Sequence, residues 1–324
     1  ATPWLPAPWH LAAGLWNMKF LSWRDRRRTA TALQRLTRRT DENFANFQQW
    51  LDHMQLTEAA QRRFFLPVIV SALSELPCDV AFTAARKVFV DGFMTKPNAF
   101  YIDVPNVSLG ELYDERFGNV LQQRGVNLHR AVSVQTVLPD DRSRLRVALR
   151  SGRIDTFDYV VLGVPWWSAG RLIAPEIQSR LGDMPESFAR LKSAAITSVH
   201  LWYDRPAIPL EHAVLLERFS QWVFARGKQR LPRSDRHGHY YQVVVSAAHR
   251  EATDDDEAAQ KTISELAEVW PQATRAHCIH AQVIAQRQAV FVPDDQSTEL
   301  RPPQRTPVPG LVLAGDWTQT GWPA

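Results

Sequence analysis

The residues that could bind a ligand most plainly lie at the end of the chain. An apolar run, Leu311-Val312-Leu313-Ala314, is followed directly by Gly315-Asp316 and then by polar and glycine positions. A short apolar run with turn residues behind it predicts a buried strand. At the carboxyl end of such a strand, an aspartate can accept a hydrogen bond from a ribose or ribitol hydroxyl, and the N–H groups of a following helix can face a phosphate. The segment predicts part of a nucleotide site, although Gly-Asp by itself favours a simple strand cap.

The whole closing run, LAGDWTQTGWPA at residues 313–324, narrows this interpretation. It resembles the carboxy-terminal flavin-contacting segment of the phytoene desaturase and amine oxidase superfamily, and its squalene-associated branch most of all. The resemblance implies FAD as the cofactor. It implies that Asp316 contacts the sugar or ribitol of the flavin and that Gly315 lets the backbone approach the phosphates. It also places four residues beside the isoalloxazine: Thr320, Gly321, Trp322 and Pro323. Trp322 is explained equally well as a core aromatic residue.

A second part of the chain carries the same resemblance. Between residues 43 and 93, the phrases FxxWL, RFFxPxxxSALxxxP and KVFxDGF occur in the order found in the helical substrate domain of hydroxysqualene dehydroxylases. The phrases VHLWYDRP, QWVFAR and VVVSAA between residues 199 and 248 also resemble that branch, where such strands floor the substrate cavity. In the central part, the resemblance implies that the backbone of Val134 pairs with the adenine ring.

The resemblance implies a reaction as well as a fold. It predicts an FAD-dependent oxidoreductase of squalene or hopanoid biosynthesis that removes the hydroxyl of hydroxysqualene and yields squalene. The twelve Trp and fifteen Phe residues suit a dry cavity for a long isoprenoid. The sequence does not identify the catalytic acid, and Asp91, Tyr203 and His200 remain candidates, each equally open to a structural role. Desaturation of a carotenoid precursor, oxidation of an amine, and an inactive membrane-surface binding fragment are the alternatives.

Other kinds of site find little support in the sequence. His237, His239, His277, Cys278 and His280 could suggest zinc, but their spacing fits no closed tetrahedral pattern. Neither a nucleophile elbow nor a P-loop motif occurs. With 38 basic and 34 acidic residues, the charge is too balanced to indicate nucleic acid. We therefore predict no metal and no nucleic-acid partner.

The first forty residues contain features that are typical of attachment to a membrane surface. Trp4, Trp9, Trp16 and Trp23 precede a basic helical pattern that starts with Arg24-Asp25-Arg26-Arg27-Arg28 and runs through Arg39. Such a stretch fits attachment to an anionic membrane surface, and equally a helix packed on the body with solvated arginines. The prolines near the start break any spanning helix. Two cysteines make no disulfide framework, which favours a reducing compartment. We predict a cytoplasmic protein, with peripheral attachment to the cytoplasmic face of the inner membrane as the membrane interpretation.

The predicted fold is mixed α/β, a Rossmann-like FAD-binding domain with an inserted substrate domain of helices and antiparallel sheet. Four segments are expected: a helical substrate or membrane-facing part at 1–104, a central FAD-binding part at 105–167, the substrate sheet and helix at 168–287, and a closing FAD-binding segment at 288–324. Helices are expected to start at Asp41-Glu42-Asn43 and Thr57-Glu58 and to cover 80–93, with strands at 196–203, 221–224 and 241–246 and a charged loop at 227–240.

One expected motif is missing from the sequence. No G-x-G occurs anywhere, so the glycine fingerprint that binds the pyrophosphate in dinucleotide sites is absent. We expect the chain to lack an amino-terminal βαβ unit of about 30 residues and a carboxy-terminal helix, to bind FAD poorly when made alone, and to show little turnover.

Overall fold

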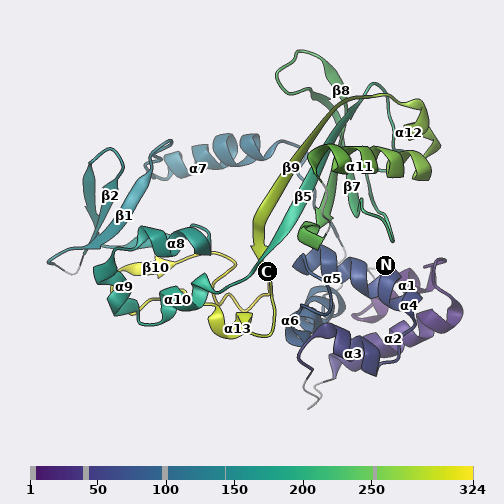
Figure 1. Cartoon of the computed structure of the whole chain (residues 1–324), viewed down its shortest axis with the longest axis horizontal. Coiled ribbons are helices and arrows are strands. Elements are labelled where there is room, and N and C mark those ends of the chain that lie inside the picture. The colour runs from purple at the N-terminus through teal and green to yellow at the C-terminus, as the bar shows by residue number, and fades with distance from the viewer. Residues whose placement is uncertain (1–4, 39–43, 97–100, 143, 251–253, 324) are drawn as a thin grey trace. The chain divides into compact units, whose positions relative to one another are not determined.

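A computed structural model describes residues 5–38, 44–96, 101–142, 144–250 and 254–323. The chain divides into two compact units (Figure 1). The first unit contains residues 1–100, 192–297 and 322–324, and the second contains residues 101–191 and 298–321. Each unit therefore draws on segments that are far apart in the sequence. The assignment of cofactor and substrate roles to the four predicted segments remains a prediction.

The amino-terminal part of the first unit is helical, as predicted. Its helical segments are η1 (Trp9–Leu11), α1 (Ala12–Trp16), α2 (Trp23–Thr37), α3 (Phe47–His53), α4 (Glu58–Ala60), η2 (Gln61–Phe65), α5 (Leu66–Leu73), α6 (Phe82–Lys87) and η3 (Val88–Met94). A helix is expected to start at residues 41–43, but these lie outside the described residues. Helix α3 begins at Phe47, with Asn46 as its N-cap. The helix expected over 80–93 is present as α6 followed by the π-helical stretch η3, which ends at Met94.

Polar side chains cap these helices. The hydroxyl of Ser22 accepts the N–H of Asp25, whose carboxylate accepts the Ser22 N–H in return. Asp25 also accepts a hydrogen bond of 2.6 Å from the hydroxyl of Thr57, which itself caps α4 through the N–H of Ala60. Because these hydrogen bonds favour the carboxylate, the pKa of Asp25 lies below its usual value. One buried carboxylate thus joins the starts of two helices.

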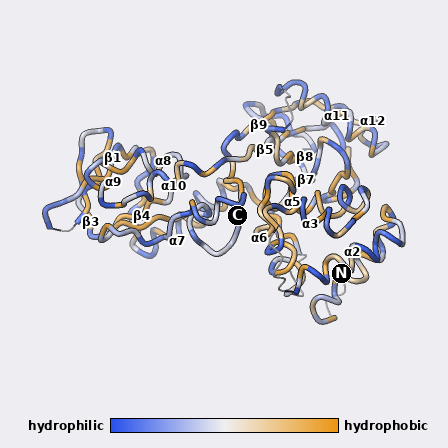
Figure 2. Tube along the Cα trace, turned by 60° about the horizontal axis from the view of Figure 1, so that its bottom comes forward, coloured by the Kyte–Doolittle hydropathy of each residue, from blue (hydrophilic) through white to orange (hydrophobic). Residues whose placement is uncertain are grey.

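Aromatic rings form the centre of this helical part. The ring of Phe47 stacks on Trp50 at 5.2 Å and on Phe89 at 5.7 Å, and Phe65 meets Phe89 edge to face at 5.3 Å. These side chains are almost completely buried. Hydrophobic residues accordingly concentrate along α5 (orange in Figure 2). The π-helical turn η2 ends at Phe65, two residues before Pro67, and the proline lacks the N–H needed for a regular α-helical turn.

The rest of the first unit is a five-stranded antiparallel sheet in the order β6-β7-β8-β5-β9. Its strands are β5 (Ser193–Tyr203), β6 (His212–Val214), β7 (Trp222–Arg230), β8 (His237–Ser246) and β9 (Cys278–Phe291). The three strands predicted here are confirmed. The charged loop predicted at 227–240 is wrong, because β7 continues to Arg230 and β8 begins at His237. The hydrophilic residues there pair across a hairpin, with Arg230 opposite His237.

One face of this sheet is covered by a helix. Val199, Leu201 and Tyr203 point to the side where they share a core with Leu266 of α11 (Asp255–Val269). The short helices η5 (Ala248–Arg250) and α12 (Pro271–Arg275) flank α11 along the chain. His200 and Trp202 alternate with these core residues and therefore lie on the opposite face. The alternation of Ser198, His200 and Trp202 with Val199, Leu201 and Tyr203 predicts the same division from the sequence alone.

The second unit contains two small sheets and several short helices. Its elements are η4 (Gly110–Phe117), α7 (Gly118–Gln123), β1 (Val134–Pro139), β2 (Leu145–Leu149), β3 (Ile154–Phe157), β4 (Val160–Leu162), α8 (Trp166–Leu172), α9 (Pro175–Leu181), α10 (Met184–Ala189), β10 (Leu311–Leu313) and α13 (Ser297–Leu300), which starts at the border of the units. Strands β1, β2 and β3 form an antiparallel sheet, and β10 pairs with β4 in parallel. Because β4 and β10 are parallel, their carboxyl ends lie at one common edge.

Candidate flavin site

The candidate site lies at the carboxyl ends of the two parallel strands. Leu311, Val312 and Leu313 lie opposite Val160, Val161 and Leu162, and the N–H of Ala314 donates to the carbonyl of Leu162 at 3.0 Å. The apolar run from 311 is the strand that the sequence predicts. The strand passes into turns and bends, and no helix follows Gly315 within the described residues. The backbone N–H groups after Gly315 are therefore not arranged as they would be at the start of a helix.

Gly315 has a conformation and a neighbour that both require glycine. Its φ is +151°, in the region that side chains other than glycine rarely adopt. A Cβ atom added here would lie 2.5 Å from Nε1 of Trp317. Trp317 is buried, donates from Nε1 to the carbonyl of Val164 at 3.0 Å, and meets Phe188 edge to face at 5.3 Å. The glycine thus makes room for an indole that joins the ends of both strands.

Asp316 is the exposed carboxylate at this edge. Its Oδ1 accepts the N–H of Trp317 at 2.9 Å, which fixes the side chain over the turn. No hydrogen bond to its Oδ2 is present among the described residues. An exposed carboxylate oxygen of this kind can accept a hydrogen bond from a sugar or polyol hydroxyl. The role in flavin binding that the sequence resemblance implies for Asp316 stays a prediction.

Arg301 holds the turn together, and the sequence analysis does not identify it as a site residue. Its guanidinium donates to the carbonyl of Asp316 at 2.7 Å, to the carbonyl of Thr318, and to the hydroxyl of Thr320 at 3.0 Å. Burial lowers the pKa of Arg301 from its usual value. The hydroxyl of Thr318 adds a bond of 2.7 Å to the carbonyl of Gly315. The only sequence signal for Arg301 is the Arg-Pro pair that precedes the closing strand.

The other predicted cofactor-binding residues lie in different places. Gly321 has a φ of +78° and no atoms where a Cβ would point. Val134 is the first residue of β1, in the antiparallel sheet of the second unit. Trp322 and Pro323 belong to the first unit, where Lys87 Nζ lies 5.5 Å from the centre of the Trp322 ring. The structure thus groups Gly315, Asp316 and Thr320 around one turn, whereas Val134 lies on a separate sheet.

The three candidates for the catalytic acid differ in their surroundings. Asp91 is half-exposed and pairs with Lys87 at 3.5 Å. Tyr203 lies in the core under α11, where burial raises its pKa. His200 lies on the opposite, aromatic face, where its Nδ1 is 2.6 Å from the hydroxyl of Tyr240 and burial lowers its pKa. Among these candidates, His200 combines partial burial with a position on a face that α11 does not cover.

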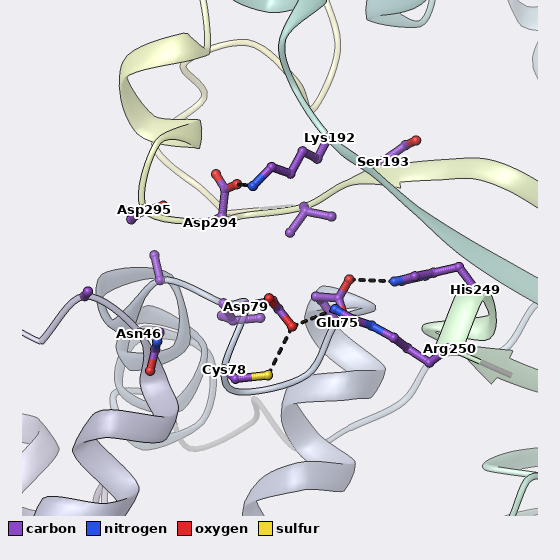
Figure 3. A pocket seen from close by; sticks show the side chains of 14 residues that line it. Asn46, Glu75, Cys78, Asp79, Lys192, Ser193, His249, Arg250, Asp294 and Asp295 are labelled. Carbon is purple, nitrogen blue, oxygen red and sulfur yellow. Dashed lines mark hydrogen bonds and ion pairs between the residues drawn. The ribbon is translucent and has the colours of Figure 1, made fainter.

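A polar pocket of about 430 Å³ lies elsewhere in the first unit (Figure 3). At its wall, the buried Glu75 pairs with His249 at 2.9 Å and with Arg250 at 3.1 Å. Arg250 also pairs with Asp79 at 2.6 Å, and Asp79 accepts a hydrogen bond of 3.0 Å from the Cys78 thiol. Burial and Asp79 raise the pKa of Cys78, so the thiol stays protonated. These groups satisfy one another, and we interpret the pocket as a structural ionic network.

Two further features of the described residues bear on the sequence predictions. The described residues contain no group of three or more histidine, cysteine, aspartate or glutamate side chains arranged to hold a metal ion. Cys278 and His280 do share a face of β9, as their spacing predicts. Within the same residues, the helices are all too short or too polar to cross a lipid bilayer.

Comparison with known proteins gives the family. The model of the flavin containing amine oxidoreductases matches residues 3–324, and the chain belongs to this family. FAD, the cofactor predicted from the sequence, is thereby confirmed, and so is the mixed α/β fold with an FAD-binding part.

Individual relatives are distant. A hydroxysqualene dehydroxylase from Zymomonas mobilis is 23% identical over 82% of this chain and 59% of its own length. A 15-cis-phytoene desaturase from an Oncidium hybrid is 24% identical over 56% of this chain and 32% of its own length. The solved oxidoreductase from Methanosarcina mazei is 16% identical, with a TM-score of 0.65 over 92% of this chain and 68% of that one. The chain spans between a third and three-fifths of the length of the two curated relatives described here.

Proposed function

We propose that the protein is a flavin-dependent oxidoreductase of squalene and hopanoid biosynthesis that reductively removes the hydroxyl group of hydroxysqualene to give squalene. The observation that carries the proposal is the aromatic face of the five-stranded sheet. On it, Trp202 stacks on Tyr240 at 4.7 Å, and Trp222 stacks on Phe224 at 5.6 Å. Such a surface suits a long apolar polyene better than it suits a small polar amine.

The reaction defines what these residues must do. The carbon–oxygen bond breaks, the hydroxyl takes up a proton and leaves as water, and the carbon receives a hydride. Reduced FAD, when bound, supplies that hydride. The aromatic rings of this face exclude water and stabilise positive charge that develops on the allylic carbon. A hydrogen-bond donor near the hydroxyl would favour its departure.

The turn after β10 would hold part of the cofactor. Asp316 would accept a hydrogen bond from a ribose or ribitol hydroxyl, and Gly315 would let the backbone approach the phosphates. Thr320, Gly321, Trp322 and Pro323 would lie beside the isoalloxazine, and the backbone of Val134 would contact the adenine. Arg301 supports this arrangement, since it fixes the carbonyl of Asp316 and the hydroxyl of Thr320 at once.

The relatives support the substrate class and also the principal alternative. The hydroxysqualene dehydroxylase and the phytoene desaturase both bear names that refer to long isoprenoids. Desaturation of a phytoene-like carotenoid precursor on the same scaffold is therefore the second candidate. The two are distinguished by incubating the protein with FAD and either hydroxysqualene or phytoene and analysing the products. Squalene from the first substrate supports our proposal, whereas a desaturated product from the second alone supports the alternative.

We also propose that the amino-terminal segment attaches to the surface of a membrane. Trp9, Trp16 and Trp23 are 66%, 48% and 54% exposed, and Trp16 and Trp23 meet edge to face at 4.0 Å. Trp4 lies outside the described residues. Arg24 and Arg27 of α2, which follow Trp23 closely in the sequence, are exposed as well. Exposed indoles next to arginines favour the interface of an anionic bilayer, where a lipophilic substrate would be found.

A further inference from the structure

Two buried N–H groups on the aromatic face have no hydrogen-bond partner in the described protein. They are Nε2 of His200 and Nε1 of Trp202. Both belong to β5 and are two residues apart, so their side chains project from the same face of the strand. Their ring centres lie 6.5 Å apart. Because buried polar groups are nearly always hydrogen-bonded, two neighbouring exceptions call for an explanation.

The hydroxyl of Tyr240 determines which nitrogen of His200 carries the proton. This hydroxyl lies 2.6 Å from Nδ1 of His200, and their rings are nearly parallel, at 7°. Burial raises the pKa of Tyr240 and lowers that of His200, so both groups are neutral near pH 7. Because no other acceptor for the Tyr240 hydroxyl lies among the described residues, we assign its O–H as the donor to Nδ1, which leaves the proton on Nε2. His200 and Trp202 therefore each present an N–H donor.

The surroundings explain why these donors are suited to a ligand. Trp202 is 6% exposed, and its ring is held between Tyr240 at 4.7 Å and His280 at 5.2 Å. Its indole cannot turn towards solvent without breaking these ring contacts. Tyr203 also has a buried hydroxyl without a partner, but it lies on the opposite face, in the core with α11. Of these three groups, only His200 Nε2 and Trp202 Nε1 lie on the face that we assign to the substrate.

We propose that His200 Nε2–H and Trp202 Nε1–H form a donor pair that binds an oxygen acceptor of the ligand, namely the hydroxyl oxygen of an allylic isoprenoid alcohol. The inference rests on the proposed function and deepens it. Tyr240 is then a positioning residue, because it fixes the tautomer of His200 without touching the ligand. The pair distinguishes the alcohol from the corresponding hydrocarbon, whose apolar surface leaves both donors unpaired.

The test compares two ligands of nearly equal shape. Binding of hydroxysqualene and of squalene to the protein is measured in detergent micelles by competition. We expect the protein to prefer the alcohol by about tenfold, the effect of one or two neutral hydrogen bonds. His200→Phe and Trp202→Phe should abolish the preference while squalene still binds, which shows that the fold and the apolar face are intact. Tyr203→Phe, the control on the opposite face, should retain the preference.

A second readout does not depend on ligand affinity. Nitrogen-15 NMR of the histidine side chains should show His200 as the Nε2-protonated tautomer, and Tyr240→Phe should allow the other tautomer. Equal affinity for both ligands, a preference that survives both donor substitutions, or an Nδ1-protonated His200 would overturn the inference while leaving the proposed reaction open. If neither ligand binds, the proposed substrate is wrong, and the proposal of a donor pair is wrong as well.

Discussion

The indole Nε1 of Trp317 donates a hydrogen bond of 3.0 Å to the carbonyl oxygen of Val164. This contact joins the residues that follow β10 to those that follow β4, which are 153 positions apart in the sequence. It fixes the shared carboxyl edge of the parallel strands, where Asp316 is exposed. A buried aromatic residue thus determines the shape of the turn that we assign to the flavin.

Gly315→Ala should disturb this turn strongly. The new Cβ would lie 2.5 Å from Nε1 of Trp317, and alanine is unfavourable at a φ of +151°. We expect a loss of roughly 2–4 kcal/mol of stability from the combined strain and overpacking, measured by urea denaturation. Gly152→Ala is the matched control, since its φ is +89° but no atom lies within 4 Å of the added carbon. Equal losses in the two variants would show that the indole contact is unimportant.

Arg301→Lys should weaken cofactor binding. Lysine keeps the charge but cannot reproduce the guanidinium that donates to Asp316, Thr318 and Thr320 together. We expect the dissociation constant for FAD to rise by about tenfold, measured by quenching of flavin fluorescence. Arg305→Lys, at an exposed position nearby in the sequence, should have little effect. An unchanged dissociation constant for FAD in Arg301→Lys would show that this turn does not contribute to cofactor binding.

The amino-terminal indoles should bind vesicles that contain phosphatidylglycerol. Replacing Trp9 and Trp16 by alanine removes exposed apolar surface next to the basic helix, and we expect partitioning to fall by roughly tenfold. Added salt should weaken the binding of the unmodified protein, because arginines contribute. Tyr159→Ala, which removes an aromatic residue that is 76% exposed in the second unit, serves as control. An equal effect of the control, or none from either change, would argue against the membrane proposal.

Asp204 should make the stability depend on pH in acid. Its carboxylate accepts hydrogen bonds from Arg205 and from the N–H of His277, and these lower its pKa to about 2. Because the folded pKa lies below the unfolded value, the stabilisation is present above the unfolded pKa and is lost as the pH falls through the folded one. The melting temperature of the unmodified protein should therefore fall more steeply between about pH 4 and pH 2 than that of Asp204→Asn. Asp235→Asn, at a fully exposed site, should follow the unmodified protein.

Local sequence patterns predict much of the fold. The alternation in 196–203 correctly assigns His200 and Trp202 to one face and Val199 and Leu201 to the other, because the period of two is a property of the strand itself. The apolar run at 311 correctly gives β10. The hairpin at 227–240 is missed because its hydrophilic, largely exposed residues carry no hydrophobic alternation.

Contacts between distant segments could not be predicted from the sequence. The pairing of His200 with Tyr240 depends on the register of β5 and β8, in which His200 lies opposite Gln242. The role of Arg301 depends on a turn that brings together carbonyl groups 15 and 17 positions further along the chain. Neither register nor turn geometry leaves a local signal in residue types. The roles of Arg301 and Tyr240 are therefore identified from the structure and not from the sequence.

The most direct test of the proposed function is a single turnover without oxygen. The protein, supplied together with the amino-terminal glycine-fingerprint unit that we expect FAD binding to need, is loaded with FAD, the flavin is reduced chemically, and hydroxysqualene is added while the absorbance of oxidised flavin is followed. Our account predicts that the oxidised absorbance returns and that squalene forms in an amount equal to the flavin oxidised, whereas added squalene has no effect. If the flavin stays reduced and hydroxysqualene is recovered unchanged, the proposed reaction is wrong.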